Sequence, residues 1–202
     1  MYAKYFKRVM DLICSCLALI TLSPIFLIIS LLVKINLGSP VLFVQQRLGK
    51  DDKVFNHIKF RSMTNDKDKF GQLLSNEQRL TKFGRILRST SLDELPQLIN
   101  VIKGEMSIIG PRPLPVKYLS LYTEEQRKRH KVRPGLSNIS AVTGRNKLTW
   151  EEKFEKDVWY VNNISFLLDC KIIIKTIIVV LKREGTTGSS GDFRSEFKGT
   201  NV

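Results

Sequence analysis

The segment Arg85-Ile-Leu-Arg88-Ser-Thr-Ser91-Leu-Asp93-Glu94-Leu-Pro96 carries two adjacent carboxylates where an apolar helical pattern begins. Ser91-x-x-Glu94 has the spacing of a helix capping box. Pro96 fits best in a first helical turn, where no backbone N–H is needed, so Asp93 is an alternative cap. Both registers place the carboxylates in the first turn of a helix that ends at Gly104, a residue that favours the left-handed conformation found after helices.

Carboxylates at the positive end of a helix dipole are expected to stay ionised, and a phosphate can bind beside them. Neighbouring helical residues diverge by about 100°, so two separate roles are more natural than a shared proton. We predict that one carboxylate attacks phosphorus and the other binds Mg²⁺. Arg88 and Arg112, the latter stiffened by Pro111 and Pro113, are candidates to grip phosphate oxygens. The plain alternative is that Ser91-x-x-Glu94 only caps a helix.

The composition indicates one modest catalytic domain with a hydrophobic core and a polyanionic partner. The chain has 202 residues, 43% of them hydrophobic, and a net charge of +14. Nucleic acid, anionic lipid and nucleotide-phosphate substrates all suit this charge. The three cysteines have no paired spacing, and His57 and His130 lack the surroundings of a zinc site. We therefore expect reduced thiols and no zinc.

The N-terminal part of the chain is predicted to enter a membrane. Residues 1–11 are basic and amphipathic, which suits a position at a lipid headgroup layer. Leu12–Val33 is uncharged and long enough for the roughly 20 residues of a spanning helix. Ser23 and Pro24 interrupt this run, and basic residues flank both of its ends. Because flanking lysine and arginine prefer the cytoplasmic side, we predict a re-entrant helix over residues 1–35 that turns at Ser23-Pro24. A kinked span is also compatible with the proline.

Residues 36–183 are predicted to form an α+β, predominantly helical catalytic domain. Val41–Arg47 and Lys53–Met63 have the pattern of a small β-hairpin, with Lys59 and Arg61 on one face of its second strand. These two cations are either functional or simply solvated. A row of basic residues steps by three before the carboxylates and is either a solvated helix face or a phosphate-attracting wall: Arg79, Lys82, Arg85 and Arg88.

Three later segments have helical signals. Thr123–Gln126 and Thr149–Glu152 are capping boxes; the first precedes a basic run predicted to face anionic lipid or water, and the second precedes Asp157, a further candidate acid. Phe166–Leu181 is apolar but too charged to span, so it lies at the membrane interface or packs under the active site. Residues 184–202 are predicted to be a flexible or locally draped tail.

Several motifs in this order resemble the small monotopic phosphoglycosyl transferases of the bacterial sugar transferase family, over about residues 1–183. They are Lys59-Phe-Arg-Ser-Met63, Arg88–Gln97, Asn100–Gly104, Gly110-Pro-Arg-Pro113, Arg133-Pro-Gly135 and Asp157-Val-Trp-Tyr160. One segment departs, because the family commonly has Pro-Gly-(Ile/Leu)-Thr-Gly-Trp-Ala-Gln-Val where this chain has Pro134-Gly-Leu-Ser-Asn-Ile-Ser-Ala-Val142.

The resemblance implies that a sugar 1-phosphate passes from a UDP-sugar to undecaprenyl phosphate at the cytoplasmic face of the bacterial inner membrane. Asp93 would be the nucleophile that releases UMP, and Glu94 its partner in binding Mg²⁺. Five residues fall on family positions that bind phosphates or nucleotide sugar: Lys59, Arg88, Arg112, Arg145 and Asp157. The closest likeness is to members that transfer N,N′-diacetylbacillosamine 1-phosphate in protein N-glycosylation; the alternative is another UDP-sugar for O-antigen or capsule.

Two rival classes use the same charge. A nucleic-acid-binding protein would be expected to carry a recognition module with aromatic residues, and the chain shows none in its sequence, so we expect no nucleic-acid partner. A non-enzymatic lipid-surface protein that binds polyanions leaves Asp93, Glu94 and Arg112 without a role.

Overall fold

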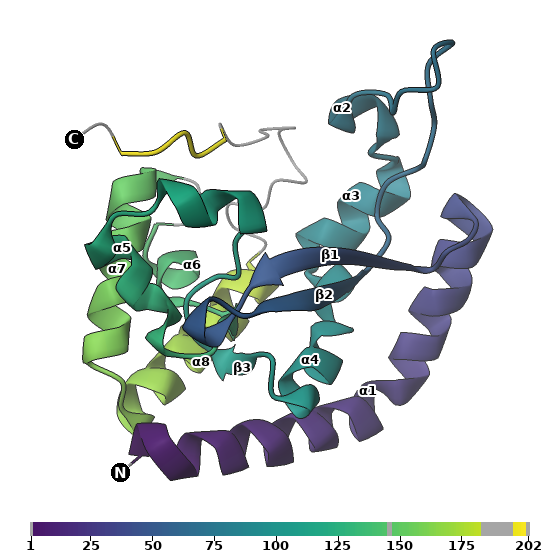
Figure 1. Cartoon of the computed structure of the whole chain (residues 1–202). Coiled ribbons are helices and arrows are strands. Elements are labelled where there is room, and N and C mark those ends of the chain that lie inside the picture. Colours follow the sequence, from purple (N-terminus) through teal and green to yellow (C-terminus); the bar gives the residue numbers. More distant parts are fainter. Residues whose placement is uncertain (1, 145–146, 183–195, 201–202) are drawn as a thin grey trace.

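A long N-terminal helix runs along one side of the molecule and bends on its way (Figure 1). The computed structural model describes residues 2–144, 147–182 and 196–200. Helix α1 (Lys7–Leu37) follows a short π-helical turn, η1 (Tyr2–Phe6), and contains Pro24, which bends a helix because it cannot donate a backbone hydrogen bond. The hydroxyl of Ser23 donates to the carbonyl of Ile20 at 2.8 Å, the acceptor that Pro24 cannot use. A re-entrant course and a kinked span both fit this bend, so the re-entrant topology stays a prediction.

Helix α1 has a narrow inward face and a broad apolar outward face. Asp11, Ser15, Ile29 and Val33 are buried, whereas large apolar residues along the rest of the helix are exposed. Within the described residues, the length and composition of Tyr2–Leu37 would allow it to cross a membrane. Only 11% of its most apolar 18-residue stretch is buried in the protein. Such exposed apolar surface supports association with a membrane.

The predicted hairpin is present and lies against α1. Strands β1 (Leu42–Leu48) and β2 (Val54–Phe60) pair antiparallel, with Leu42 opposite Phe60, and a 3-10 turn, η2 (Lys50–Asp52), joins them. Phe60 is buried among Ile29, Val33 and Leu87. Lys59 points away from this core, and its ammonium donates to the carboxylate of Glu94 at 2.5 Å.

The remaining elements complete a mostly helical α+β domain, in agreement with the predicted fold class. Three short segments surround the carboxylates: α3 (Lys82–Ser89), η3 (Leu92–Glu94) and α4 (Gln97–Lys103). Strands β3 (Ser107–Ile109) and β4 (Gly135–Ser137) pair in parallel. The other helices are α2 (Asn76–Arg79), η4 (Val116–Leu121), α5 (Glu124–Arg127), η5 (Lys128–Lys131), α6 (Ile139–Thr143), α7 (Trp150–Asn162) and α8 (Phe166–Leu181). The capping boxes that begin α5 and α7 are as predicted.

The first turns of α1 are bound to the catalytic domain by polar contacts. Lys7 pairs with Asp169 of α8 at 2.6 Å, and Asp11 accepts from the Ser107 hydroxyl at 2.7 Å. Arg8 donates to the last carbonyls of α4, where a cation is favourable. The expectation that residues 1–11 lie at a lipid headgroup layer is therefore wrong for Lys7 and Asp11, which are buried by these partners.

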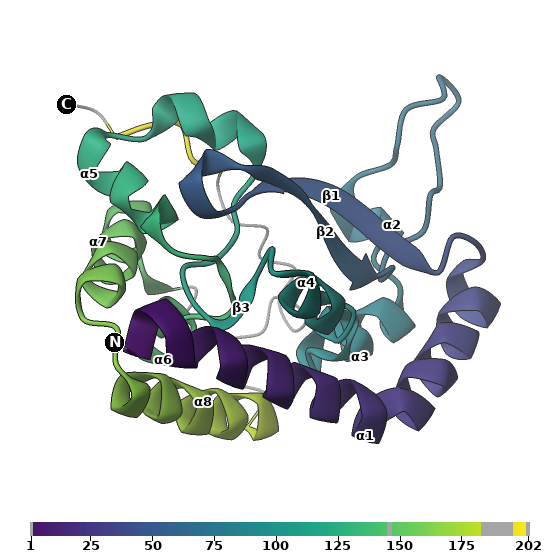
Figure 2. The ribbon, with the colours of Figure 1, turned by 60° about the horizontal axis from the view of Figure 1, so that its bottom comes forward.

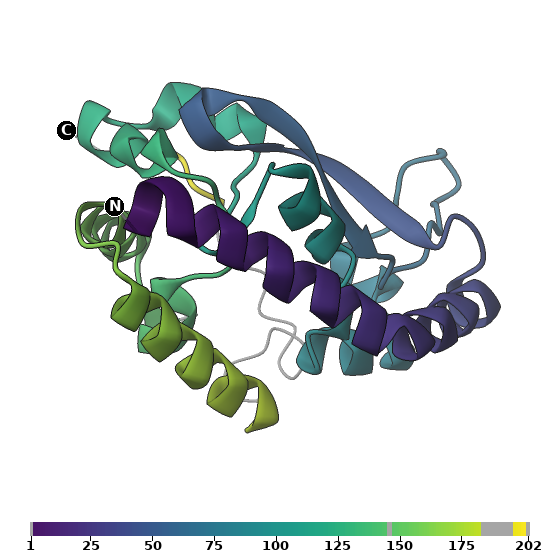
Figure 3. The same ribbon diagram turned by 90° about the horizontal axis from the view of Figure 1, so that it is seen from below.

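Helix α8 lies beside α1 (Figure 2). Like α1, it has an exposed apolar face. Asp169 and Ile172 are buried, whereas Ile174 and Leu181 are exposed. Figure 3 shows that the two helices are close at their N-terminal ends and diverge towards the C-terminal end of α8. One face of α8 packs on the domain beside the cavity, in line with the second alternative, and the position of its exposed face at a membrane interface stays a prediction.

The C-terminal prediction lies mostly outside the described residues. Residues 196–200 are described, and Phe197 is 2% exposed among Tyr118, Tyr122, Trp150 and Phe154. This part of the segment 184–202 is draped over the domain instead of being free.

Candidate active site

The two carboxylates lie on a tight turn before α4, so the predicted capping box is wrong. Helix α4 begins at Gln97 with Pro96 as its N-cap, and the Ser91 side chain makes no capping hydrogen bond. Ser91 is in the left-handed region with φ 57°, which separates η3 from α3. Glu94 cannot complete a box because its side chain binds Lys59 instead. Positive φ at a residue other than glycine is uncommon and is often found at functional sites.

Glu94 is held by two cations. Its Oε1 lies 2.5 Å from Lys59 Nζ and 3.8 Å from Arg112 Nη2. Burial raises the pKa of Glu94, but the charges of Lys59 and Arg112 outweigh it and hold that pKa at about 2. Glu94 is therefore ionised throughout the physiological range, and Lys59 is not a solvated strand cation. Arg61, just beyond the strand, is also buried, and it donates to the carbonyls of Leu37 and Ser39.

Asp93 has the opposite electrostatic environment. It is 7% exposed, and among the described residues no hydrogen bond or ion pair is made directly to its carboxylate. Burial raises the pKa of Asp93 to about 6; Glu94 adds to this effect, whereas Lys59, Arg88 and Arg112 oppose it. Adjacent carboxylates whose pKa values shift in opposite directions are typical of paired groups with different chemical roles.

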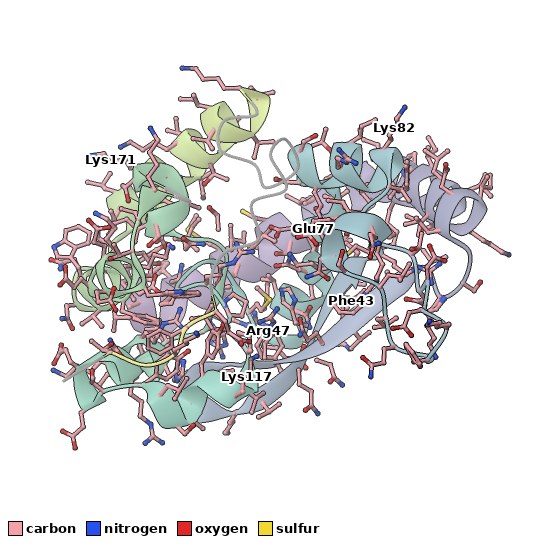
Figure 4. The ribbon with its side chains drawn as sticks, turned by 90° about the horizontal axis from the view of Figure 1, so that it is seen from above. Phe43, Arg47, Glu77, Lys82, Lys117 and Lys171 are labelled. Atoms are coloured by element: carbon pink, nitrogen blue, oxygen red, sulfur yellow. The ribbon has the colours of Figure 1, made fainter. Side chains whose placement is uncertain are left out.

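The basic row before the carboxylates is not one continuous wall. Arg88 is largely buried and donates to the Ser62 hydroxyl at 2.8 Å; burial lowers its pKa, and Asp93 opposes this shift. Arg79 donates to the carbonyl of Thr64, whereas Arg85 and Lys82 are exposed. Figure 4 shows Lys82 at the periphery and Arg47 near the middle of the molecule. Of the predicted row, Arg88 is the member that reaches the site.

A cavity of about 730 Å³ opens beside Glu94. Its cationic wall consists of Arg47, Arg88, Arg112, Arg129 and Lys153. Its aromatic wall consists of Tyr118, Trp150 and Phe154. Its apolar wall comes from α1, α4 and α8 and includes Ala18, Leu22, Leu98, Ile173, Ile177 and Val180. Glu94 is among the described residues that line the cavity and Asp93 is not, so Asp93 must become accessible before it can react with a bound molecule.

Asp157 binds the guanidinium of Arg129, a partner that the sequence did not predict. Arg129, 2% exposed, donates to Asp157 Oδ2 through Nη2 at 2.6 Å and through Nε at 3.1 Å. The same Nη2 donates to the backbone carbonyl of Arg112 at 2.6 Å. Burial raises the pKa of Asp157, and Arg129 opposes this shift. The expectation that the basic run faces lipid or water is wrong for Arg129, and nothing in the run Arg127–Lys131 distinguishes it.

The segment Pro134–Val142, which differs from the common family pattern, also lines the cavity. Asn138 caps α6 by accepting from the N–H of Ala141 at 2.8 Å, and both residues line the cavity. Ser140 lies between them, with a buried hydroxyl that has no partner among the described residues. Arg145, predicted to bind phosphate, lies outside the described residues.

The carboxylates suit a divalent cation that arrives with its substrate. Among the described residues, no group of three or more His, Cys, Asp or Glu side chains comes together. Both cation contacts of Glu94 use Oε1, which leaves Oε2 directed elsewhere. Mg²⁺ is usually bound by one or two carboxylates together with substrate phosphates and water. Asp93 and Glu94 therefore fit the chemistry of Mg²⁺ bound to a diphosphate.

The exposed apolar helix, the paired carboxylates and the cationic cavity fit a membrane-associated protein with a site for phosphorylated molecules. Comparison with known proteins gives the family: the bacterial sugar transferase model matches residues 2–183, and the chain belongs to this family of enzymes. The uncharacterized sugar transferase EpsL of Bacillus subtilis is 47% identical over 194 residues, which are 96% of each chain.

Two further relatives have names that state an activity. The UDP-glucose:undecaprenyl-phosphate glucose-1-phosphate transferase of Klebsiella pneumoniae is 45% identical over 85% of this chain and 39% of the relative. The undecaprenyl-phosphate galactose phosphotransferase of Salmonella typhimurium is 37% identical over 91% of this chain and 42% of the relative. The chain thus spans about two fifths of these relatives and nearly all of the Bacillus protein.

Proposed function

We propose that this protein transfers a sugar 1-phosphate from a UDP-sugar to undecaprenyl phosphate and releases UMP, with Asp93 as the covalent nucleophile. The observation that supports this proposal most directly is the pair of neighbouring carboxylates whose pKa values shift in opposite directions beside a cationic cavity. The named activities of the Klebsiella and Salmonella relatives support the two substrates.

The reaction has two displacement steps at one phosphorus atom. An oxygen of the Asp93 carboxylate bonds to the phosphorus that carries the sugar, and the bond from that phosphorus to the bridging oxygen breaks. UMP leaves with this oxygen and its bonding electron pair. A phosphate oxygen of undecaprenyl phosphate then attacks the same phosphorus, the bond to Asp93 breaks, and the carboxylate is restored.

The local electrostatics suit this division of labour. Asp93, with a pKa of about 6, is the more basic carboxylate and the better nucleophile once ionised. Glu94 stays ionised beside Lys59 and can contribute to cation binding. Arg112, whose side chain is about half exposed, can turn from Glu94 to a phosphate oxygen. Mg²⁺, when bound, would screen the repulsion between these carboxylates and the diphosphate.

The donor sugar and the membrane topology are parts of the same proposal. UDP-N,N′-diacetylbacillosamine is the donor that the sequence motifs favour. The competitors are UDP-glucose, which the name of the Klebsiella relative gives, and a galactose donor, which the name of the Salmonella relative suggests. The exposed apolar face of α1 supports association with a membrane. The monotopic topology in the bacterial inner membrane, with the site towards the cytoplasm, rests on the family resemblance and on the basic residues at both ends of the apolar run. Anionic lipid of the inner leaflet suits the net charge of +14.

Exchange of labelled UMP into UDP-sugar, without undecaprenyl phosphate, tests the mechanism. A covalent intermediate makes the first step reversible on its own, so label is expected to enter UDP-sugar with Mg²⁺ present and in wild-type protein. Asp93→Asn is the matched control and is expected to show no exchange. Exchange that requires undecaprenyl phosphate would exclude the covalent route, and a panel of UDP-sugars in the same assay identifies the donor.

A further inference from the structure

Helices α1 and α8 form an apolar wall of the cavity that also borders the exposed apolar faces of both helices. Ala18 and Leu22 contribute from α1, and Ile173, Ile177 and Val180 contribute from α8. The helices are joined at one end by the ion pair between Lys7 and Asp169. They diverge beyond this pair (Figure 3). The cavity is therefore lined from both helices in the region where they separate.

The cavity changes character between this wall and the carboxylates. Glu94, Arg88 and Arg112 supply charge on one side. The side chains from α1 and α8 are hydrocarbon except that of Thr176, whose hydroxyl is bound to Ser137 and to the carbonyl of Ile172. An anionic head group with a long apolar chain matches this division, because arginine binds phosphate oxygens and apolar side chains favour methylene groups over water. A nucleotide sugar has no apolar chain to cover the second wall.

The outer surfaces of the same two helices indicate where such a chain would go. Leu17 and Ile20 of α1 and Ile174 and Ile178 of α8 are exposed, and they lie next to the residues that line the cavity. A hydrocarbon chain that leaves between the helices would pass from the cavity to surface that already suits lipid. It would not have to cross a polar surface.

We propose that the wall between α1 and α8 binds the first isoprene units of the acceptor lipid, whose chain leaves between these helices while its phosphate lies near Arg88 and Arg112. This inference rests on the proposed function and adds the location of the acceptor. The donor would then use the aromatic and cationic walls from η4, α7 and the segment at Arg112.

Ala18→Phe tests the wall from the α1 side, with Leu17→Phe as its matched control. Phenylalanine at position 18 occupies space that the chain would use, whereas Leu17 is exposed and outside the described lining. Displacing about two methylene groups corresponds to an increase of roughly tenfold in the apparent KM for undecaprenyl phosphate. Geranyl phosphate has only the two isoprene units nearest the phosphate, which are the units that would contact this wall, so it is expected to lose about as much. UMP exchange without acceptor is expected to stay at the wild-type level.

Ile177→Asn and Ile174→Asn test the α8 side with a second matched pair. Both residues are about half exposed, but Ile177 lines the cavity and Ile174 is outside the described lining. A polar amide costs the same membrane contact at both positions, so only Ile177→Asn is expected to raise the KM for undecaprenyl phosphate. If Ala18→Phe fails to fold, this pair of variants still tests whether the wall binds the lipid chain.

Three results would overturn the inference while leaving the proposed function intact. They are wild-type KM values for undecaprenyl phosphate in both cavity variants, a loss with undecaprenyl phosphate that geranyl phosphate does not share, and a raised KM for the UDP-sugar instead of the lipid. Absence of UMP exchange in the wild-type protein would instead contradict the covalent mechanism. Turnover with the two acceptors would then still locate the lipid chain.

Discussion

Asp93 and Asp169 are both buried carboxylates, yet their surroundings differ. Asp169 accepts hydrogen bonds from Lys7, Tyr2 and Tyr160 at 2.6–2.7 Å, so both of its oxygens have partners. Asp93 has cations nearby, but no described residue bonds to its carboxylate directly. A saturated buried carboxylate stabilises a fold, whereas an unsaturated one retains basicity that a reaction can use. Substitutions at and around the two carboxylates test this difference.

Asp93→Asn is expected to have the largest effect on activity. The amide keeps the shape of the side chain but cannot attack phosphorus, so turnover should fall at least about 1,000-fold. Stability at pH 8 should be unchanged or higher, because burial has raised the pKa of Asp93 and its ionisation therefore disfavours the folded state as pH rises towards 6. UMP release and thermal denaturation in detergent measure the two effects. A strongly destabilised variant would remove the contrast with Asp169.

Glu94→Gln should lower turnover by about 100-fold or more, because it removes a fixed charge beside the reacting phosphate and weakens Mg²⁺ dependence. It should also change the pH profile. In the wild-type protein the first step should rise with pH and reach half its maximum near pH 6, where Asp93 ionises. Removing the negative charge of Glu94 lowers the pKa of Asp93, so the midpoint should move to lower pH. An unchanged midpoint would mean that the charge of Glu94 does not affect the pKa of Asp93.

Arg129→Lys should reduce kcat by about 10- to 100-fold with a smaller change in the KM for the donor. Lysine keeps the charge but cannot bind Asp157 and the Arg112 carbonyl together, so the Arg112 backbone loses its support. Single-turnover UMP release gives the chemical step. Lys128→Ala, at a partly exposed neighbour, serves as the control. An equal loss in both variants would mean that Arg129 does not position Arg112.

Asp169→Asn should have the smallest effect on chemistry and a large effect on stability. It leaves the buried ammonium of Lys7 unpaired, which costs about 3–5 kcal/mol of unfolding free energy. Folded protein should release UMP at close to the wild-type rate. Thermal denaturation and the first half-reaction, measured on one preparation, test this. A lost half-reaction in folded protein would assign Asp169 a role in catalysis.

Local sequence signals predicted much of the fold, while contacts distant in sequence decided the site. The hairpin, the boxes at Thr123 and Thr149, and Phe166–Leu181 depend on periodicity and caps within a few residues, and all are present. The box at Ser91 failed because Lys59, 35 residues away, binds Glu94.

The same limit applies to the charged residues that sequence analysis placed in solvent or at lipid. Arg129 lies in a basic run, and its partner Asp157 is 28 residues away on α7. Arg8 and Asp11 resemble a membrane-flanking segment, but they bind backbone groups more than 90 residues away. Charge and spacing singled out Asp93 and Glu94 as candidates, and only the tertiary structure shows how this pair is supported.

The most direct test uses the protein with UDP-sugar labelled in the sugar and Mg²⁺, in detergent and without undecaprenyl phosphate. The account predicts one equivalent of UMP per active site and label that remains on the peptide containing Asp93 after proteolysis and mass spectrometry. Addition of undecaprenyl phosphate should remove this label. Absence of UMP and of bound label under these conditions, or label on another residue, would contradict the assignment of Asp93.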